Sequence, residues 1–161
     1  MLNAQEIIHE DDYNKIMGVC NILAGEANAK LVFIVDKNGQ LLTSSGEVGN
    51  LDTTSLATLA AGNIAATGGL AKLLGEKEFS ILFHEGEKDN LHLSIIAERY
   101  ILVVVFDNST TSLGLVRLRV RKSSQQLEEI FLEMAKRNSK EEANPLFAEI
   151  TDEDIDNLFN D

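Results

Sequence analysis

Residues Lys30–Gly46, KLVFIVDKNGQLLTSSG, carry the strongest local structural signal in the chain. The uninterrupted apolar run from Leu31 to Val35 is typical of a buried strand. The turn sequence Asp36-Lys37-Asn38-Gly39 follows, and its Asn-Gly pair accepts positive φ angles before the chain continues into Leu41-Leu42. The stretch therefore predicts a β-hairpin.

Amphipathic helices are predicted on both sides of this hairpin. On the N-terminal side, apolar residues recur every three or four positions from Glu10 to about Ala27. On the C-terminal side, Asp52 is placed to cap a long helix that runs to about Gly75.

Three further apolar stretches follow the long helix: Phe79–Phe83, Leu91–Ala97 and Tyr100–Phe106. Charged or turn-like segments separate them, as in an antiparallel meander. Together with the hairpin they predict five strands.

The final element, Ser112–Arg137, is ambiguous at its start, because Arg117–Arg121 alternates like a strand. A helix is favoured, since its apolar residues lie near a single helical stripe and no turn interrupts them. The predicted order is helix, two strands, helix, three strands, helix and tail.

Composition and charge indicate one α/β domain with an acidic tail. The 161 residues are 44% hydrophobic and 25% charged, which is ordinary for a single globular domain. We expect the domain to span residues 1–137, and an acidic flexible tail to span residues 138–161 because a polar linker and the breaker Pro145 follow the last helix. Residues 141–161 hold eight acids and no Lys or Arg, so most of the net charge of −12 lies in the tail. Such a chain is repelled by phosphate backbones and anionic lipids, which favours a protein partner over nucleic acid or membrane.

Targeting signals are not recognisable. The N-terminus has neither a basic region nor a long apolar run, so no signal peptide is predicted and a cytoplasmic location is expected. Residues 53–71 are free of charge, but their Thr, Ser, Asn and Gly content argues against a membrane span.

Catalytic and metal-binding patterns are equally hard to find. His9, His84 and His92 lack the spacing of a metal site, and no Ser or Cys lies in a nucleophile motif. Cys20 has no partner Cys and is expected to be a buried thiol on a helix. We therefore expect no active site, no metal and no cofactor.

The long helix has one unusual face. Its predicted core stripe consists of larger apolar residues: Leu56, Leu59, Ala60, Ile64, Leu70 and Leu74. The opposite side carries small residues where an exposed helix normally carries charges: Thr58, Ala61, Gly62, Ala65, Gly68 and Gly69. Glycines inside a helix lower its stability, and small side chains let another backbone approach closely. We expect this face to contact another molecule, with burial inside the same domain as the alternative.

Two other segments are candidate contact sites. Thr151 can cap a short acidic helix in the tail, and the apolar residues of this segment suit docking into a groove: Phe147, Ile150, Ile155, Leu158 and Phe159. A disordered solubilising tail is the alternative. The basic run Arg117, Arg119, Arg121 and Lys122 is expected to be a solvated helix face, although it could meet an acidic partner or the chain's own tail.

The order of elements resembles the Roadblock/LC7 family. The resemblance extends to particular strings and is close to the bacterial gliding-motility branch of that family: ANAKLVFIVDKNGQLLTSSG, LDTTSLATLAAGNIAATGGLAKLLGE, FHEGEKDNLHLSII, LVVVFDNSTTSLGLVRLR and FAEITDEDIDNLF. It implies a profilin-like three-layer sandwich with the order α-β-β-α-β-β-β-α around a five-stranded antiparallel sheet.

The resemblance also implies a function. The chain would be a homodimer that binds a small Ras-like GTPase of the MglA type and stimulates its GTP hydrolysis, controlling cell polarity and motility, with a polar location in a bacterial cell. The GTPase would bind at Thr58, Ala61, Gly62, Ala65, Gly68, Gly69 and Lys72. The dimer would form through Glu78, Phe79, Ser80, Ile81, Leu82 and Phe83. No Arg lies in residues 53–71, so reshaping of the GTPase is favoured over an arginine finger.

Three other interpretations compete with this one. The chain could be a dimeric Roadblock adaptor that does not activate a GTPase, or it could modulate nucleotide exchange through its tail. A small-molecule sensor is less favoured, because Leu, Ile and Val fill the strands and leave few convergent polar groups.

Overall fold

The computed structural model describes residues 8–142 and 152–159. It contains one five-stranded antiparallel sheet with the strand order β2-β1-β5-β4-β3. The strands are β1 (Leu31–Asp36), β2 (Leu41–Gly46), β3 (Ile81–His84), β4 (Asp89–Ile96) and β5 (Tyr100–Asp107). The five predicted strands and the α/β class are confirmed.

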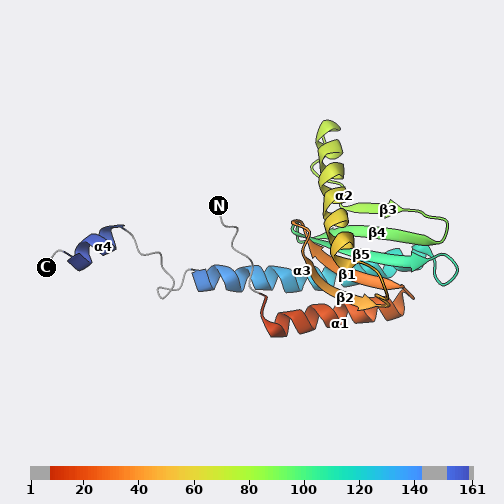
Figure 1. The fold of residues 1–161 in the computed structure, drawn as a ribbon, viewed down its shortest axis with the longest axis horizontal. Helices are drawn as coiled ribbons and strands as arrows, with labels where there is room; N and C mark the ends of the chain where they lie inside the picture. The colour runs from red at the N-terminus through yellow and green to blue at the C-terminus, as the bar shows by residue number, and fades with distance from the viewer. Residues whose placement is uncertain (1–7, 143–151, 160–161) are drawn as a thin grey trace.

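Helices cover both faces of this sheet (Figure 1). One face packs against α1 (Glu10–Glu26) and α3 (Leu113–Glu142), and the other against α2 (Thr53–Leu73). Successive side chains of β1 point to opposite faces of the sheet. Val32 and Ile34 pack in the core under α1 and α3, and Phe33 and Val35 pack in the core under α2. The three-layer sandwich is therefore confirmed.

The turn between β1 and β2 is built on Asp36. Its carboxylate accepts the backbone N–H groups of Asn38 and Gln40, and its carbonyl accepts the N–H of Gly39 at 3.0 Å. Gly39 adopts φ +93°, whereas Asn38 stays at negative φ, so only the glycine of the Asn-Gly pair uses the left-handed region. A Cβ at Gly39 would lie 3.3 Å from the Cα of Thr58, which means that the hairpin turn packs directly on α2.

The bounds of β3 and β4 differ from expectation. β3 begins at Ile81, so Glu78, Phe79 and Ser80 precede the strand rather than form it, although the Ser80 carbonyl still accepts the N–H of Ile95 at 2.9 Å. β4 ends at Ile96, one residue early, because Ala97 and the next residue take positive φ in the turn to β5.

The last long helix is confirmed, and it is longer than predicted. Ser112 accepts the N–H of Leu115 on its hydroxyl and so starts α3, which excludes a strand at Arg117–Arg121. The helix continues through Glu142, so residues 138–142 are helical and not a linker. A short helix, α4 (Asp152–Phe159), follows in the tail, where Leu158 and Phe159 are exposed.

Candidate partner-binding surface on α2

The ends of α2 are set by local hydrogen bonds. Asp52 accepts the N–H of Ser55 at 3.1 Å and the Ser55 hydroxyl at 2.6 Å, and these bonds hold the pKa of Asp52 below its ordinary value. At the other end Gly75, at φ +78°, donates to the carbonyl of Lys72, while Glu76 donates to that of Ala71. This pair of bonds is the Schellman arrangement and ends the helix just after Leu73.

The face of α2 that meets the sheet is made mostly of alanines. Its buried positions are Ala57, Ala60, Ala61, Ile64 and Ala71. The predicted core stripe was therefore partly wrong, because Leu59, Leu70 and Leu74 are exposed instead. Ala61, placed on the outer face by the sequence argument, is only 7% exposed, since the β1–β2 turn and the sheet cover it. Small side chains let α2 lie close to the sheet, and the leucines are left outside.

These outward leucines form one flank of α2, which we call the leucine flank: Leu59, Leu70, Leu73 and Leu74. The side-chain amide of Asn63 lies 2.8 Å from the ring of His84, which places this side of the helix over β3 at the sheet edge. On the opposite face of that edge, Ile81 is also exposed. Figure 1 shows the C-terminal part of α2 extending beyond β3. An apolar surface therefore borders the free edge of the sheet.

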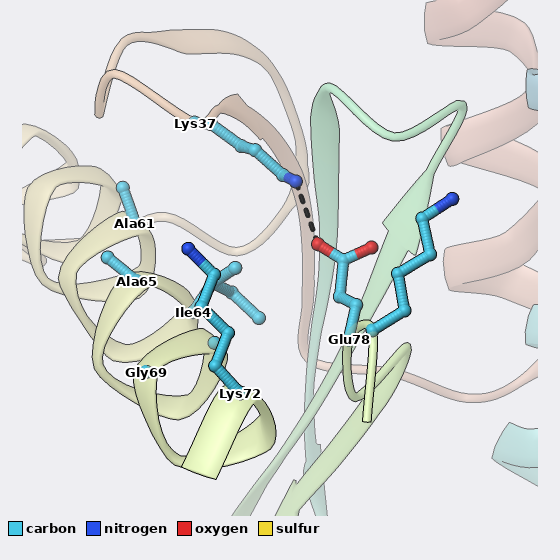
Figure 2. A pocket seen from close by; sticks show the side chains of 9 residues that line it. Lys37, Ala61, Ile64, Ala65, Gly69, Lys72 and Glu78 are labelled. Carbon is cyan, nitrogen blue, oxygen red and sulfur yellow. Dashed lines mark hydrogen bonds and ion pairs between the residues drawn. The ribbon is translucent and has the colours of Figure 1, made fainter. Parts of the chain in front are cut away.

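The other flank of α2 borders a cleft of about 300 Å³ (Figure 2). The helix supplies small residues and one cation to it: Ala61, Ile64, Ala65, Gly68, Gly69 and Lys72. The facing wall consists of Lys77 and Glu78 from the segment that leads to β3, together with Lys37 from the hairpin turn. Lys37 donates to a Glu78 carboxylate oxygen at 2.8 Å and closes one end of the cleft.

The glycines of α2 are not required by packing within the chain. A Cβ added at Gly62, Gly68 or Gly69 would meet nothing within 4 Å. All three lie inside a helix, where alanine is more stable than glycine. The stability that is lost at these three positions is therefore not explained by packing among the described residues.

The predicted contact residues separate into three groups. Ala65, Gly68, Gly69 and Lys72 line the cleft, as does the buried Ala61. Thr58 is exposed beside the hairpin turn, and Gly62 is exposed without lining the cleft. Sequence reasoning missed Lys37 and Lys77 because they reach the cleft only through the fold. Of the predicted tail motif, Phe147 and Ile150 lie outside the described residues, and the side chain of Ile155 is not described.

Among residues 8–142 and 152–159, no group of three or more His, Cys, Asp and Glu side chains could hold a metal ion. None of the helices in the described ranges is long and apolar enough to cross a membrane.

A Roadblock/LC7 domain model matches residues 18–106, more than half of the chain. The chain belongs to the Roadblock/LC7 family. Among solved structures, the chain is similar to Myxococcus xanthus MglB. The two share 57% sequence identity and a TM-score of 0.76, and the match covers 80% of this chain and 96% of that one.

A second solved structure, the gliding protein MglB from Thermus thermophilus, has 32% identity and a TM-score of 0.76, covering 82% of this Roadblock/LC7 chain and 99% of that one. Profilin IA of Acanthamoeba castellanii shares the fold alone, at 12% identity and a TM-score of 0.53, covering 70% and 96% of the two chains. Curated protein sequences gave no significant match.

Proposed function

We propose that this chain is a homodimeric regulator that binds a small Ras-like GTPase of the MglA type and stimulates its GTP hydrolysis, controlling cell polarity and gliding motility from the cytoplasm and cell pole. The similarity to MglB supports the family role. The main support from the geometry is the open space at Gly62, Gly68 and Gly69, which favours close contact between α2 and a partner.

Dimerisation and GTPase binding would use different flanks of α2. The leucine flank and the β3 edge would face a second copy of the chain, because exposed apolar side chains and unpaired strand groups lie together there. The cleft flank, with Ala65 and Gly69, would face the GTPase. Of the residues predicted for the dimer strand, Ile81, Leu82 and Phe83 lie in β3 and would contact the second copy, whereas Glu78 precedes the strand and lines the cleft.

Activation would act through the GTPase's own catalytic residues. No Arg lies on α2, so an arginine finger from this helix is not available. Ordering the switch segments of a GTPase can align its attacking water without any group donated by the activator. The chain would then contribute shape and charge rather than a catalytic side chain.

Single-turnover GTP hydrolysis by the cognate GTPase tests the proposal. We expect wild-type chain to accelerate hydrolysis, and the double variant Ala65→Arg, Gly69→Arg to lose the effect, because two long side chains would fill the contact surface. Gln125→Arg, Gln126→Arg on the exposed side of α3 is the control, since it adds the same two charges away from α2. A wild-type chain that binds the GTPase without accelerating it would instead be a non-activating Roadblock adaptor.

The tail is a second candidate contact with the GTPase. Leu158 and Phe159 are 77% and 82% exposed on α4, which suits docking on a partner and a role in nucleotide exchange. Deletion of residues 144–161 should change GTPase affinity or exchange rate. Unchanged values for both quantities would leave the tail as a solubilising segment.

A further inference from the structure

The cleft beside α2 gathers positive charge on an acidic protein. The chain has 14 basic residues against 26 acidic ones, yet the cleft wall contains Lys37, Lys72 and Lys77 with Glu78 as its one acid. Local charge of this sign favours an anionic ligand even where the protein as a whole repels anions.

The three lysines differ in whether an ion pair within the chain already engages their ammonium groups. Lys37 is held by Glu78 at 2.8 Å, and Lys77 lies 3.5 Å from Glu98 in a well-exposed pair. Lys72 is exposed and has no ion-pair partner among the described residues. Figure 2 shows it on the last turns of α2, on the side that borders the cleft. Lys72 is therefore the cation that a ligand in the cleft would meet.

The surroundings favour a carboxylate over a phosphate group. The cleft lies along the C-terminal half of α2, where the helix dipole is negative and disfavours a doubly charged anion. Backbone N–H groups there are used inside the helix, and the cations are separate ammonium groups rather than the planar fork of an arginine. A side-chain carboxylate, which carries a single negative charge, suits this site better than a phosphate group.

We infer that the cleft receives an Asp or Glu side chain of the GTPase and that Lys72 is the residue that selects for it; this inference rests on the proposed function. Gly68 and Gly69 leave room for the partner backbone to come close enough for its carboxylate to reach Lys72. The Lys37–Glu78 pair forms part of the facing wall. Because Glu78 is bound to Lys37, it does not compete with the partner's carboxylate for Lys72.

The test compares Lys72→Met, which keeps an apolar stem, with Lys72→Glu, which reverses the charge. We expect GTPase affinity to fall in the order wild type, Met, Glu, with roughly a tenfold loss for Lys72→Glu at low ionic strength and a smaller loss at high ionic strength. Lys136→Glu, at an exposed position of α3, makes the same charge change elsewhere and should bind like wild type. Circular dichroism and the dimer mass check that each variant is folded.

A partner variant completes the experiment. Charge reversal of individual Asp and Glu residues on the GTPase surface should reveal one Asp→Lys or Glu→Lys variant that regains affinity for Lys72→Glu. Equal affinity of wild type and Lys72→Glu, with hydrolysis still stimulated, would overturn the inference and leave the proposed function intact. Absence of any GTPase binding by wild type would overturn both. Saturable binding of inorganic phosphate that is lost in Lys72→Met would overturn the carboxylate assignment.

Discussion

His92 is an example of a polar residue placed in an apolar layer by strand alternation. It lies opposite Phe83 on β3 and Val104 on β5, is almost fully buried, and has no hydrogen-bond partner for either ring nitrogen in the described part of the chain. Burial, and secondly the positive charge of Arg117, lower its pKa. Burial therefore favours the neutral imidazole over the protonated one in the folded protein.

Acid should destabilise the chain partly through His92. In the unfolded chain this residue takes up a proton as the pH falls below about 6.5, while the folded chain resists protonation, so stability is lost with a slope of up to about 1.4 kcal/mol per pH unit. His92→Leu should flatten the dependence of unfolding free energy on pH between about 6.5 and the lower folded pKa. Parallel pH profiles for wild type and variant, measured by urea unfolding, would refute this role.

Cys20 should be unreactive in the folded chain. Burial raises the pKa of its thiol to about 11, an effect opposed only by its contact with Thr43, so almost no thiolate exists at neutral pH. A thiol-specific reagent should label Cys20 at a rate limited by opening of the fold, and rapidly in denaturant. Native labelling as fast as that of a free thiol would contradict the buried position.

At the scale of elements, α2 contains glycines that lower its helical stability and leave its surface open. Gly62, Gly68 and Gly69 have helical backbone and free space where a Cβ would lie, whereas Gly39 has positive φ and touches α2. The two kinds of glycine therefore differ in what a side chain would do.

Alanine should stabilise the helical positions and destabilise the turn. We expect Gly62→Ala, Gly68→Ala and Gly69→Ala each to raise the free energy of unfolding by about 0.5–1 kcal/mol, because alanine loses less backbone entropy. Gly39→Ala should lower it, since its Cβ would be strained and only 3.3 Å from the Cα of Thr58. Chemical denaturation measures all four, and a destabilised Gly62→Ala would show that an unrecognised contact occupies that space.

At the scale of the whole molecule, the exposed apolar surface is unevenly distributed. Leu70, Leu73 and Leu74 of the leucine flank lie at the C-terminal end of α2, which extends beyond β3 (Figure 1), while Leu118 is a separate exposed leucine on α3. Leu70 and Leu118 are 59% and 58% exposed in the single chain. The two leucines are therefore equally exposed, but only Leu70 lies on the proposed dimer surface, so Leu118 is a suitable control position.

A charge at Leu70 should separate the proposed dimer. Leu70→Glu should give a folded monomer by sedimentation or light scattering, because a carboxylate would be buried without a partner between the two copies. Leu118→Glu should remain dimeric, since the same change there stays in water. A dimeric Leu70→Glu variant would move the interface away from the leucine flank.

The elements themselves could be predicted because their signals are local. The apolar run of β1, the Asp36–Gly39 turn and the Asp52 cap depend on neighbours within a few residues, and the structure reproduces each of them. Leu59 and Leu70 were wrongly expected in the core, because helical periodicity alone predicts that the larger apolar residues face inward. The sheet approaches the helix closely, so that mainly alanines (Ala57, Ala60 and Ala61), with Ile64, pack there, and periodicity carries no information on that distance.

By itself, the sequence determined five strands, three long helices and their order, together with a family resemblance carried by its motifs. The tertiary structure alone decided which flank of α2 meets the free edge of the sheet and which borders a cleft. It also decided that Lys37, Lys72 and Glu78 line one cleft, although the first lies far from the others in the chain. The reason is physical: hydrogen bonds and caps act over one or two turns, whereas a shared surface depends on how whole layers pack.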